Sequence, residues 1–379
     1  MRQSIKLALA AAAVSAAFGV QAAEVSLYGS VSTGLVFKNT PELTGNATDQ
    51  NVAKSNSLAM ESGWFGDSIW GITGEEELGN GWTVGFTLEN EFGSDTGALA
   101  TDNTIFDSQA YLRVGNDMFN FAAGNIGGLA SAGGDFDMIG GFDPMGAFFD
   151  IGGMGAFASK DYASGNMLVA EITPMEGLKV SLMGSVGEED SKPAWEDRTH
   201  YYGIGASYEV GAFAAAAVVE MLNYNSIDNA QDRYNNDDDG YTFTLGVSYD
   251  FGVVKPSFVY QHADKIRFAT EDEEPVGTYK FDSFLLGATA PIADGTLMAS
   301  VQYVKAKNSF DSAEEADATI LAVAYNYELS KRTSIWTGAT YAIGGDGLDK
   351  DLGNKTEFKA MDRGDYNSFT FGLGLVHTF

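Results

Sequence analysis

The feature of this sequence that most limits its fold is an alternation of apolar and polar residues that recurs along the whole chain. Residues 241–251 carry an aromatic or aliphatic side chain at every odd position and Thr, Gly, Ser or Asp at every even one. The last segment, from Phe369 to the terminal Phe379, repeats the alternation. Because side chains of a β-strand point alternately to its two faces, this period of two predicts strands with one apolar and one polar face.

We find sixteen such segments, and the connections between them alternate in length. Tight turns rich in Gly, Asn, Asp and Pro occupy 79–81, 116–117, 174–177, 209–211 and 293–295, while long polar loops join the other segments. An even strand number with this alternation of connections is typical of a bacterial transmembrane barrel rather than of a soluble sandwich. The segments lie near 25–37, 68–76, 82–92, 107–115, 118–125, 164–173, 178–187, 199–208, 213–223, 241–251, 254–264, 280–290, 296–306, 316–328, 333–343 and 367–379.

After residue 22 the chain has no run of 18 or more apolar residues, so no membrane-spanning helix is predicted. A closed barrel is the other structure that pairs every backbone group within lipid. The sequence therefore predicts an all-β fold, a 16-stranded transmembrane antiparallel β-barrel with short periplasmic turns and long outer loops.

The first residues have the pattern of a secretory signal peptide. Arg2 and Lys6 precede an apolar stretch over 7–19, and small residues follow up to Ala22. We expect cleavage after Ala22, which divides the chain into a signal peptide, 1–22, and one barrel domain, 23–379.

Composition excludes several classes of function. The net charge of −30 repels nucleic acid, and the absence of cysteine excludes disulfides, thiol catalysis and thiolate metal sites. The three histidines, His200, His262 and His377, stand in no recognisable catalytic motif, so we do not expect an enzyme.

Several motifs, in order, resemble the general porins of proteobacteria, of the neisserial and burkholderial type. The resemblance implies a water-filled diffusion channel for small hydrophilic solutes in the outer membrane. It also implies a homotrimer packed through the first strands, where Gly29, Gly34 and Gly85 would allow close approach. The motifs are Val25-Ser26-Leu27-Tyr28-Gly29, Gly74-Glu75-Glu76-Glu77-Leu78-Gly79-Asn80-Gly81, Gln109-Ala110-Tyr111, Gly205-Ala206-Ser207-Tyr208, Ser248-Tyr249-Asp250-Phe251-Gly252, Leu329-Ser330-Lys331-Arg332-Thr333 and Gly374-Leu375-Val376-His377-Thr378-Phe379.

The resemblance implies that the third loop, here 126–157, folds into the pore and narrows it. Its carboxylates are Asp135, Asp137, Asp143 and Asp150. We expect at least two of them to line the constriction, where low-dielectric walls concentrate the field of fixed charges. The alternative is that these acids are solvated loop residues held by local turns.

The resemblance further implies a ladder of basic residues on the wall facing this loop, and here the chain departs from the pattern. Alternation places Glu89 and Glu91 on the inner face, with Lys179 as an inward cation, and Arg113 is interpreted as an interfacial residue that shares the parity of Tyr111. A cation-preferring pore is therefore expected. The ladder positions are all uncharged: Ile69, Thr73, Ser108, Asn125 and Val376.

The predicted outer loops carry acidic runs at 188–190, 237–239, 271–274 and 314–315. Such runs are usually only solvated, and the alternative is that Ca²⁺ or Mg²⁺ bridges them to the phosphates of lipopolysaccharide. No cofactor is expected. Outer-membrane lipid, lipopolysaccharide and small hydrophilic solutes are the expected partners.

Two other functions remain open from the sequence. A substrate-specific channel, for example for a sugar, would have the same barrel with a binding cluster along the lumen. A barrel that serves in surface adhesion or as a structural anchor would belong to a different class, because its function would lie in the outer loops.

The terminal Phe379 is similar to the signal by which the barrel assembly machinery recognises such proteins, and it could also be a last lipid-facing aromatic. If it is the signal, deleting Phe379 should block insertion more than it destabilises a folded barrel. Folded protein in membranes, measured by gel mobility before and after heating, should fall sharply, whereas the stability of the refolded variant in a urea titration should fall to a smaller extent. A variant that inserts normally would contradict this assignment.

Overall fold

The computed structural model describes residues 24–44, 51–64, 66–130, 133–146, 163–187, 200–223, 239–269, 275–308, 315–344 and 367–379. The predicted signal peptide and its cleavage site at Ala22 lie outside the described residues.

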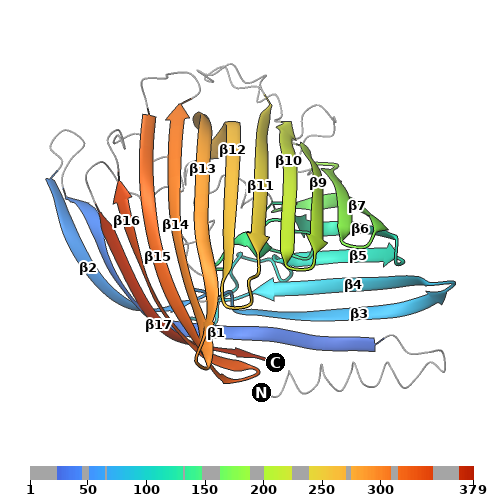
Figure 1. Ribbon diagram of the computed structural model, residues 1–379, viewed down its shortest axis with the longest axis horizontal. Coiled ribbons are helices and arrows are strands. Elements are labelled where there is room, and N and C mark those ends of the chain that lie inside the picture. The colour runs from blue at the N-terminus through green and yellow to red at the C-terminus, as the bar shows by residue number, and fades with distance from the viewer. Residues whose placement is uncertain are drawn as a thin grey trace.

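The strands form one antiparallel sheet in which successive strands pair, except that β2 and β3 both pair with β1 (Figure 1). The sixteen predicted segments are all strands, and the predicted tight turns join them. At 80–81, for example, Asn80 and Gly81 both have positive φ, 54° and 79°, which a two-residue hairpin turn of type I′ requires. The strands are β1 (Glu24–Thr44), β2 (Asn51–Ser62), β3 (Ile69–Gly79), β4 (Trp82–Glu91), β5 (Gln109–Gly115), β6 (Phe119–Gly127), β7 (Ala163–Met175), β8 (Leu178–Ser185), β9 (His200–Val210), β10 (Phe213–Asn223), β11 (Gly240–Tyr249), β12 (Lys255–Ala269), β13 (Pro275–Ile292), β14 (Gly295–Asn308), β15 (Glu315–Ser330), β16 (Thr333–Gly344) and β17 (Ser368–Thr378).

The strand that the sequence did not predict is β2. The first half of β1, Glu24–Ser30, pairs with β3, and its second half, Thr33–Thr44, pairs with β2, so that β2 and β3 lie end to end along one long strand. Figure 1 shows β1 running beside β3 at one end and beside β2 at the other. The alternation that identified the other strands is weak in β2, because Lys, Ser and Asn occupy much of it.

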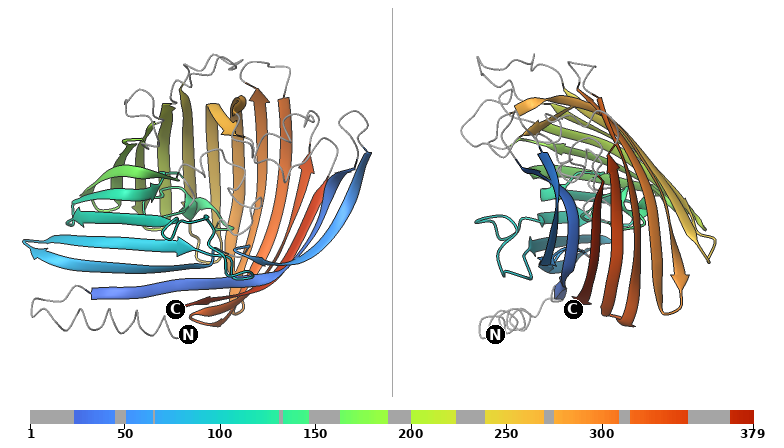
Figure 2. Two further views of the ribbon diagram at one scale, coloured as in Figure 1. Left: turned by 180° about the vertical axis from the view of Figure 1, so that it is seen from behind. Right: turned by 90° about the vertical axis from the view of Figure 1, so that its left-hand side faces the viewer.

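The sheet closes on itself between its two ends. Ser30–Asn39 of β1 pairs with Thr378–Phe369 of β17, and the backbones of Gly29 and Phe379 exchange hydrogen bonds of 3.2 and 3.0 Å. Sixteen strands therefore make a ring, with β2 as an extension beside it, and Figure 2 shows the sheet curving round between β3–β7 and β14–β17. The predicted barrel is confirmed.

The apolar face of each strand points outward, which alternation by itself could not decide. Leu286 is 62 % exposed on the outer face, whereas Thr244 and Gln302 are fully buried inside. Such a surface is stable only against lipid. The interior parity also corrects one expectation, since Gly34 and Gly85 share the inner face with Ser32 and Thr87 and are therefore not available for contact between subunits.

No helix in the described part of the chain is long and apolar enough to cross a membrane. The helical element that the structure describes is a single 3₁₀ turn, η1 (Gly140–Phe142), which lies between β6 and β7.

The seam between β1 and β17 should be intolerant of a side chain at Gly29. A Cβ there would lie 2.6 Å from the backbone oxygen of Ile69 and 2.6 Å from the ring of Phe379. We expect Gly29→Ala to lower the free energy of unfolding by about 1–3 kcal/mol, the usual cost of overpacking. Urea titration in lipid vesicles measures this, with Gly184→Ala as the control because its Cβ would make only ordinary contacts of 3.6 Å. Equal stability of the two variants would contradict the close packing of the seam.

Candidate pore constriction

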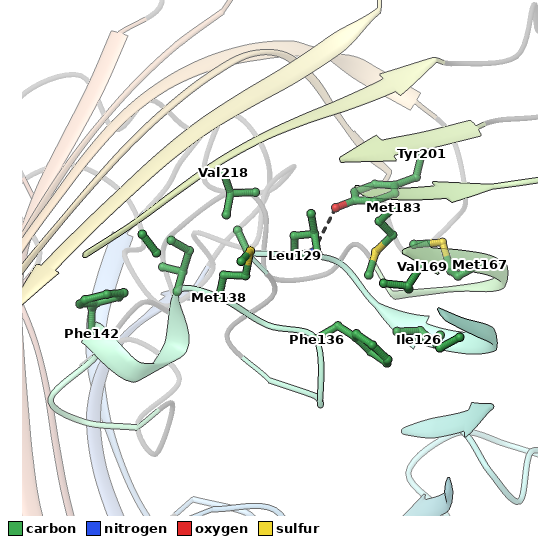
Figure 3. Packing of buried hydrophobic residues seen from close by; sticks show 14 of the residues in the cluster. Ile126, Leu129, Phe136, Met138, Phe142, Met167, Val169, Met183, Tyr201 and Val218 are labelled. Atoms are coloured by element: carbon green, nitrogen blue, oxygen red, sulfur yellow. Dashed lines mark hydrogen bonds between the residues drawn. The ribbon is translucent and has the colours of Figure 1, made fainter. Parts of the chain in front are cut away.

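The connection between β6 and β7, residues 128–162, is the predicted third loop and is named loop 3 here. The structure describes 128–130 and 133–146 of it. This part lies inside the barrel, where its apolar side chains form a buried cluster with the inner faces of neighbouring strands (Figure 3). The inward fold of the third loop is therefore present in the described residues.

Loop 3 is seated on the wall at glycines. Met138 packs against Gly205 of β9, Phe142 against Gly246 of β11, and Pro144 against Gly287 of β13, and in each case a Cβ on the glycine would overlap the loop side chain. The surrounding inner wall is apolar at Ala216, Val218, Val259 and Leu285, all of which are buried. A polar lumen thus contains an apolar patch that matches the loop.

Farther round the barrel, Met145 of loop 3 joins a second buried cluster. Its other members come from β1 and β14–β16, together with Trp64, whose indole covers Gly372 of β17. The described part of loop 3 therefore follows the wall from β9 to β16. The strands β3 and β4 and the first half of β1 are left as the wall across from the loop, since Val36 in the second half of β1 belongs to the Met145 cluster.

Beside that wall, two tyrosines donate hydrogen bonds to carboxylates, Tyr28 of β1 to Glu89 and Tyr111 of β5 to Asp135. The Tyr28 hydroxyl donates to Glu89 at 2.8 Å, and Ser108 also donates to Glu89. The Tyr111 hydroxyl donates to Asp135 of loop 3 and accepts from Thr87 at 3.1 Å. Glu89 is nearly buried, whereas Asp135 is exposed to the lumen.

The other predicted acids of loop 3 have local structural roles. Asp137 accepts hydrogen bonds from the backbone N–H groups of Ile139 and Gly140 at 3.0 and 2.7 Å, and Asp143 accepts one from Met145 at 2.8 Å. Both acids therefore hold the turn around η1, as the alternative interpretation expects, but Asp143 is buried and not solvated. Whether these acids line the constriction stays a prediction. Asp150 lies outside the described residues.

The predicted wall positions differ in what their side chains contact. Ile69 and Thr73 lie on the inner face of β3, and Glu91 follows the parity of Glu89 at the end of β4. Ser108 and Asn125 bind other protein groups, Ser108 to Glu89 and Asn125 to the carbonyls of Phe106 and Asp107. Val376 packs against the cluster around Trp64. Whether these positions govern permeation stays a prediction.

The interpretation of Arg113 as an interfacial residue is wrong. Tyr111 is 5 % exposed and faces the lumen, so Arg113, which shares its parity, faces inward and pairs with Glu75. Lys38 on the inner side of β1 pairs in turn with Glu61 at 2.8 Å. The error arose because a large aromatic on a barrel strand was taken to mark the lipid face.

Lys179 lies elsewhere, in a cavity of about 460 Å³ between loop 3 and the turn-side ends of β7–β12. Its ammonium is 3.7 Å from Glu171, and the cavity also contains Lys255 and Asp137. The inward parity predicted for Lys179 agrees with this position. No group of three or more acidic or histidine side chains that could hold a metal ion occurs among the described residues.

Sequence reasoning missed the residues that hold loop 3. The signal for them was present as interruptions of the alternation. Phe284, Leu285 and Leu286 are consecutive apolar residues, of which the first and last face lipid and Leu285 lies under loop 3. This interruption of the alternation indicates a loop contact only if it is known that a loop folds back into the lumen.

Comparisons with known proteins agree with this architecture. The profile of a family described as Gram-negative porin matches residues 8–347. An outer membrane porin protein of Bordetella pertussis is 27% identical, with 99% of this chain and 100% of that protein covered, and outer membrane porin protein 32 of Delftia acidovorans is 26% identical with the same coverage. The solved structure of an anion-selective porin from Comamonas acidovorans has a TM-score of 0.68 and 20% identity, with 94% of this chain and 100% of that one covered.

The two hydrogen bonds of Asp137 predict a stability effect. Asp137→Ala should lower the free energy of unfolding by about 0.5–2 kcal/mol, because it removes the acceptor for the N–H groups that begin η1. Asp137→Asn keeps one acceptor and should lose less. Urea titration in vesicles tests both, with the exposed Asp102→Ala expected to stay within about 0.5 kcal/mol of the wild type. A loss for Asp137→Asn as large as that for Asp137→Ala would contradict the capping role.

Proposed function

This chain is a member of the Gram-negative porins, and from that premise we propose that it is a general diffusion channel with a preference for cations. As a porin it is a passive channel of the outer membrane of a Gram-negative bacterium and not an enzyme. The aperture of the proposed pathway lies between loop 3 and the wall formed by β1, β3 and β4. Small hydrophilic solutes would pass it without a dedicated binding site.

The cation preference is supported by one observation, which is the arrangement of charged side chains around this aperture. Asp135 presents an exposed carboxylate held in place by Tyr111, with Glu89 behind it and Glu91 on the same wall. The guanidinium of Arg113, near Tyr111, is paired with the carboxylate of Glu75. A narrow passage with low-dielectric walls strengthens the field of the remaining acids, which favours cations.

The Comamonas porin is described as anion-selective, but at 20% identity the likeness concerns the fold and does not extend to the charges. In this chain the positions of the basic ladder are uncharged, as Ile69 and Thr73 on the inner face of β3 illustrate. The proposed selectivity therefore depends on the residues around the aperture of this chain.

We also propose a homotrimer. One solved structural relative, OmpT of Vibrio cholerae, is described in a trimer form, with a TM-score of 0.60. The close approach of subunits would use the outer faces of the first strands. Neither Gly34 nor Gly85 takes part, because both face the lumen.

Lipid, lipopolysaccharide and the barrel assembly machinery remain proposed partners. The exposed apolar outer face supports contact with lipid. Phe379 ends the chain beside the pairing of β1 with β17, which is the pairing that closes the barrel during assembly. Divalent cations could bridge acidic outer loops to lipopolysaccharide, but the runs 188–190 and 271–274 lie outside the described residues. Adhesion through these loops has no structural observation in its favour.

Reversal potentials across a KCl gradient test the ion preference. The wild type should prefer K⁺, and Asp135→Asn and Glu89→Gln should each weaken the preference because each removes a negative charge at the aperture. Glu75→Gln should act in the same direction by releasing Arg113 from its partner.

The matched control is Asp117→Asn, which removes the same charge from an exposed turn between β5 and β6 and should leave the potential unchanged. Chloride preference of the wild type would overturn the proposal. Saturable block by one sugar would instead favour a substrate-specific channel.

A further inference from the structure

The start of loop 3 is fastened to the wall through one buried carboxylate. Glu220 of β10 is fully buried on the inner face. Its Oε1 accepts hydrogen bonds from the Tyr201 hydroxyl at 2.7 Å and from the backbone N–H of Ala130 at 3.2 Å, and its Oε2 accepts one from Thr242 at 2.9 Å. Two strands beside β10 and one loop therefore meet at a single side chain.

Tyr201 extends this connection to a second loop residue. Its hydroxyl donates to Glu220 and at the same time accepts from the backbone N–H of Leu129 at 3.0 Å, the contact drawn in Figure 3. The N–H groups of two consecutive loop residues are thus bound to the wall. Because buried backbone donors need acceptors, this end of the loop cannot leave the wall without losing both.

The rest of the described loop is held at Asp135, whose carboxylate accepts from Tyr111 and whose backbone N–H donates to Gln109 at 3.0 Å, and by close packing on the wall. Gly205, Gly246 and Gly287, named the glycine seats here, lie on alternate strands and receive Met138, Phe142 and Pro144. A bare backbone at these points lets the loop lie closer to the wall than any side chain would permit. The loop is therefore placed by hydrogen bonds at its start and at Asp135, and by close packing along its length.

We propose that Glu220 is a positioning residue that sets the size limit of the channel, by holding loop 3 against β9–β11 so that the glycine seats can receive it. The inference rests on the proposed diffusion pathway between loop 3 and the opposite wall. Glu220 acts through its hydrogen bonds and not through its charge, because it is fully enclosed and touches no solute. Release of the loop start widens the aperture, whereas filling a seat pushes the loop into it.

Substitutions at Glu220 separate the hydrogen bonds from the charge. Glu220→Gln keeps an oxygen for Tyr201 and Ala130, and its amide N–H can donate to Thr242, whose hydroxyl can also accept. Glu220→Ala removes every contact. We expect Glu220→Ala to admit larger neutral sugars in vesicle-swelling assays and to raise single-channel conductance, and Glu220→Gln to behave as the wild type.

The matched control is Glu171→Ala. It removes another lumen carboxylate that is nearly buried, but one whose hydrogen bonds, from Asn120 at 2.8 Å and Ser181 at 3.0 Å, stay within neighbouring strands. Its sugar limit should not change. If Glu220→Ala does not fold, Tyr201→Phe replaces it, since it removes the hydroxyl that joins Leu129 to Glu220 and should widen the limit to a smaller extent.

The glycine seats provide the opposite change. Gly246→Ala would overlap the Phe142 ring and should lower conductance and the sugar limit, while Gly184→Ala, with ordinary contacts on the outer face, should alter neither. Gel mobility before and after heating shows that each barrel has folded.

An unchanged sugar limit in folded Glu220→Ala or Tyr201→Phe would overturn the proposal, and so would a Glu220→Gln variant as wide as Glu220→Ala. Neutral sugars report size alone. If the proposed cation preference is wrong, the reversal potentials will show it. The sugar limits of the Glu220 variants can still be interpreted in that case.

Discussion

Closure of the hydrogen-bonded ring is the constraint on which the rest of this protein depends. In hydrocarbon every backbone N–H and C=O must be paired within the protein, and a sheet achieves this only when its two edges meet. Here the edges meet where β1 pairs with β17 and the backbones of Gly29 and Phe379 bond to each other. The long β1 pairs on its other side with both β2 and β3, so one strand supports the seam and the start of the barrel.

Closure of the barrel also determines which face of the sheet carries the polar side chains. With lipid outside, the lumen receives the polar face, and a loop that enters the lumen must find either polar partners or an apolar surface there. Loop 3 finds both. Its start is bonded by Tyr201 and Glu220, and its middle packs on an apolar patch around Gly246. The aperture is what remains between this fixed loop and the wall that carries Glu89.

This arrangement separates two tasks that a porin performs. Size exclusion depends on where the loop lies, which is determined by buried contacts on β9–β13. In the proposed channel, ion preference depends on the exposed carboxylate of Asp135, which loop 3 carries and Tyr111 of β5 binds. The anchoring contacts lie on other strands than Tyr111, but Asp135 belongs to loop 3, so a displacement of the loop also moves this charge.

The sequence alone determined the barrel. Alternation with a period of two located sixteen strands, and turn residues located the hairpins, because both depend on local backbone geometry. It also identified Glu89 and Lys179 as inward groups by parity, whereas Asp135 was assigned to the pore through the family resemblance. It missed β2, where the alternation is weak, and it placed Tyr111 and Arg113 on the wrong face because one aromatic side chain suits lipid or lumen equally well.

The tertiary structure alone decided which face meets lipid and what each inward residue contacts. In the sequence Leu285 is one more apolar residue, and only the structure shows that loop 3 covers it. Likewise, only the structure shows that Asp137 accepts hydrogen bonds from the N–H groups at the start of η1. In the sequence Glu220 is a single acid in an apolar strand, and only the structure shows that it accepts a hydrogen bond from the backbone N–H of Ala130 in loop 3. Periodicity records the direction of a side chain, whereas a contact between residues ninety positions apart depends on the closed fold that brings them together.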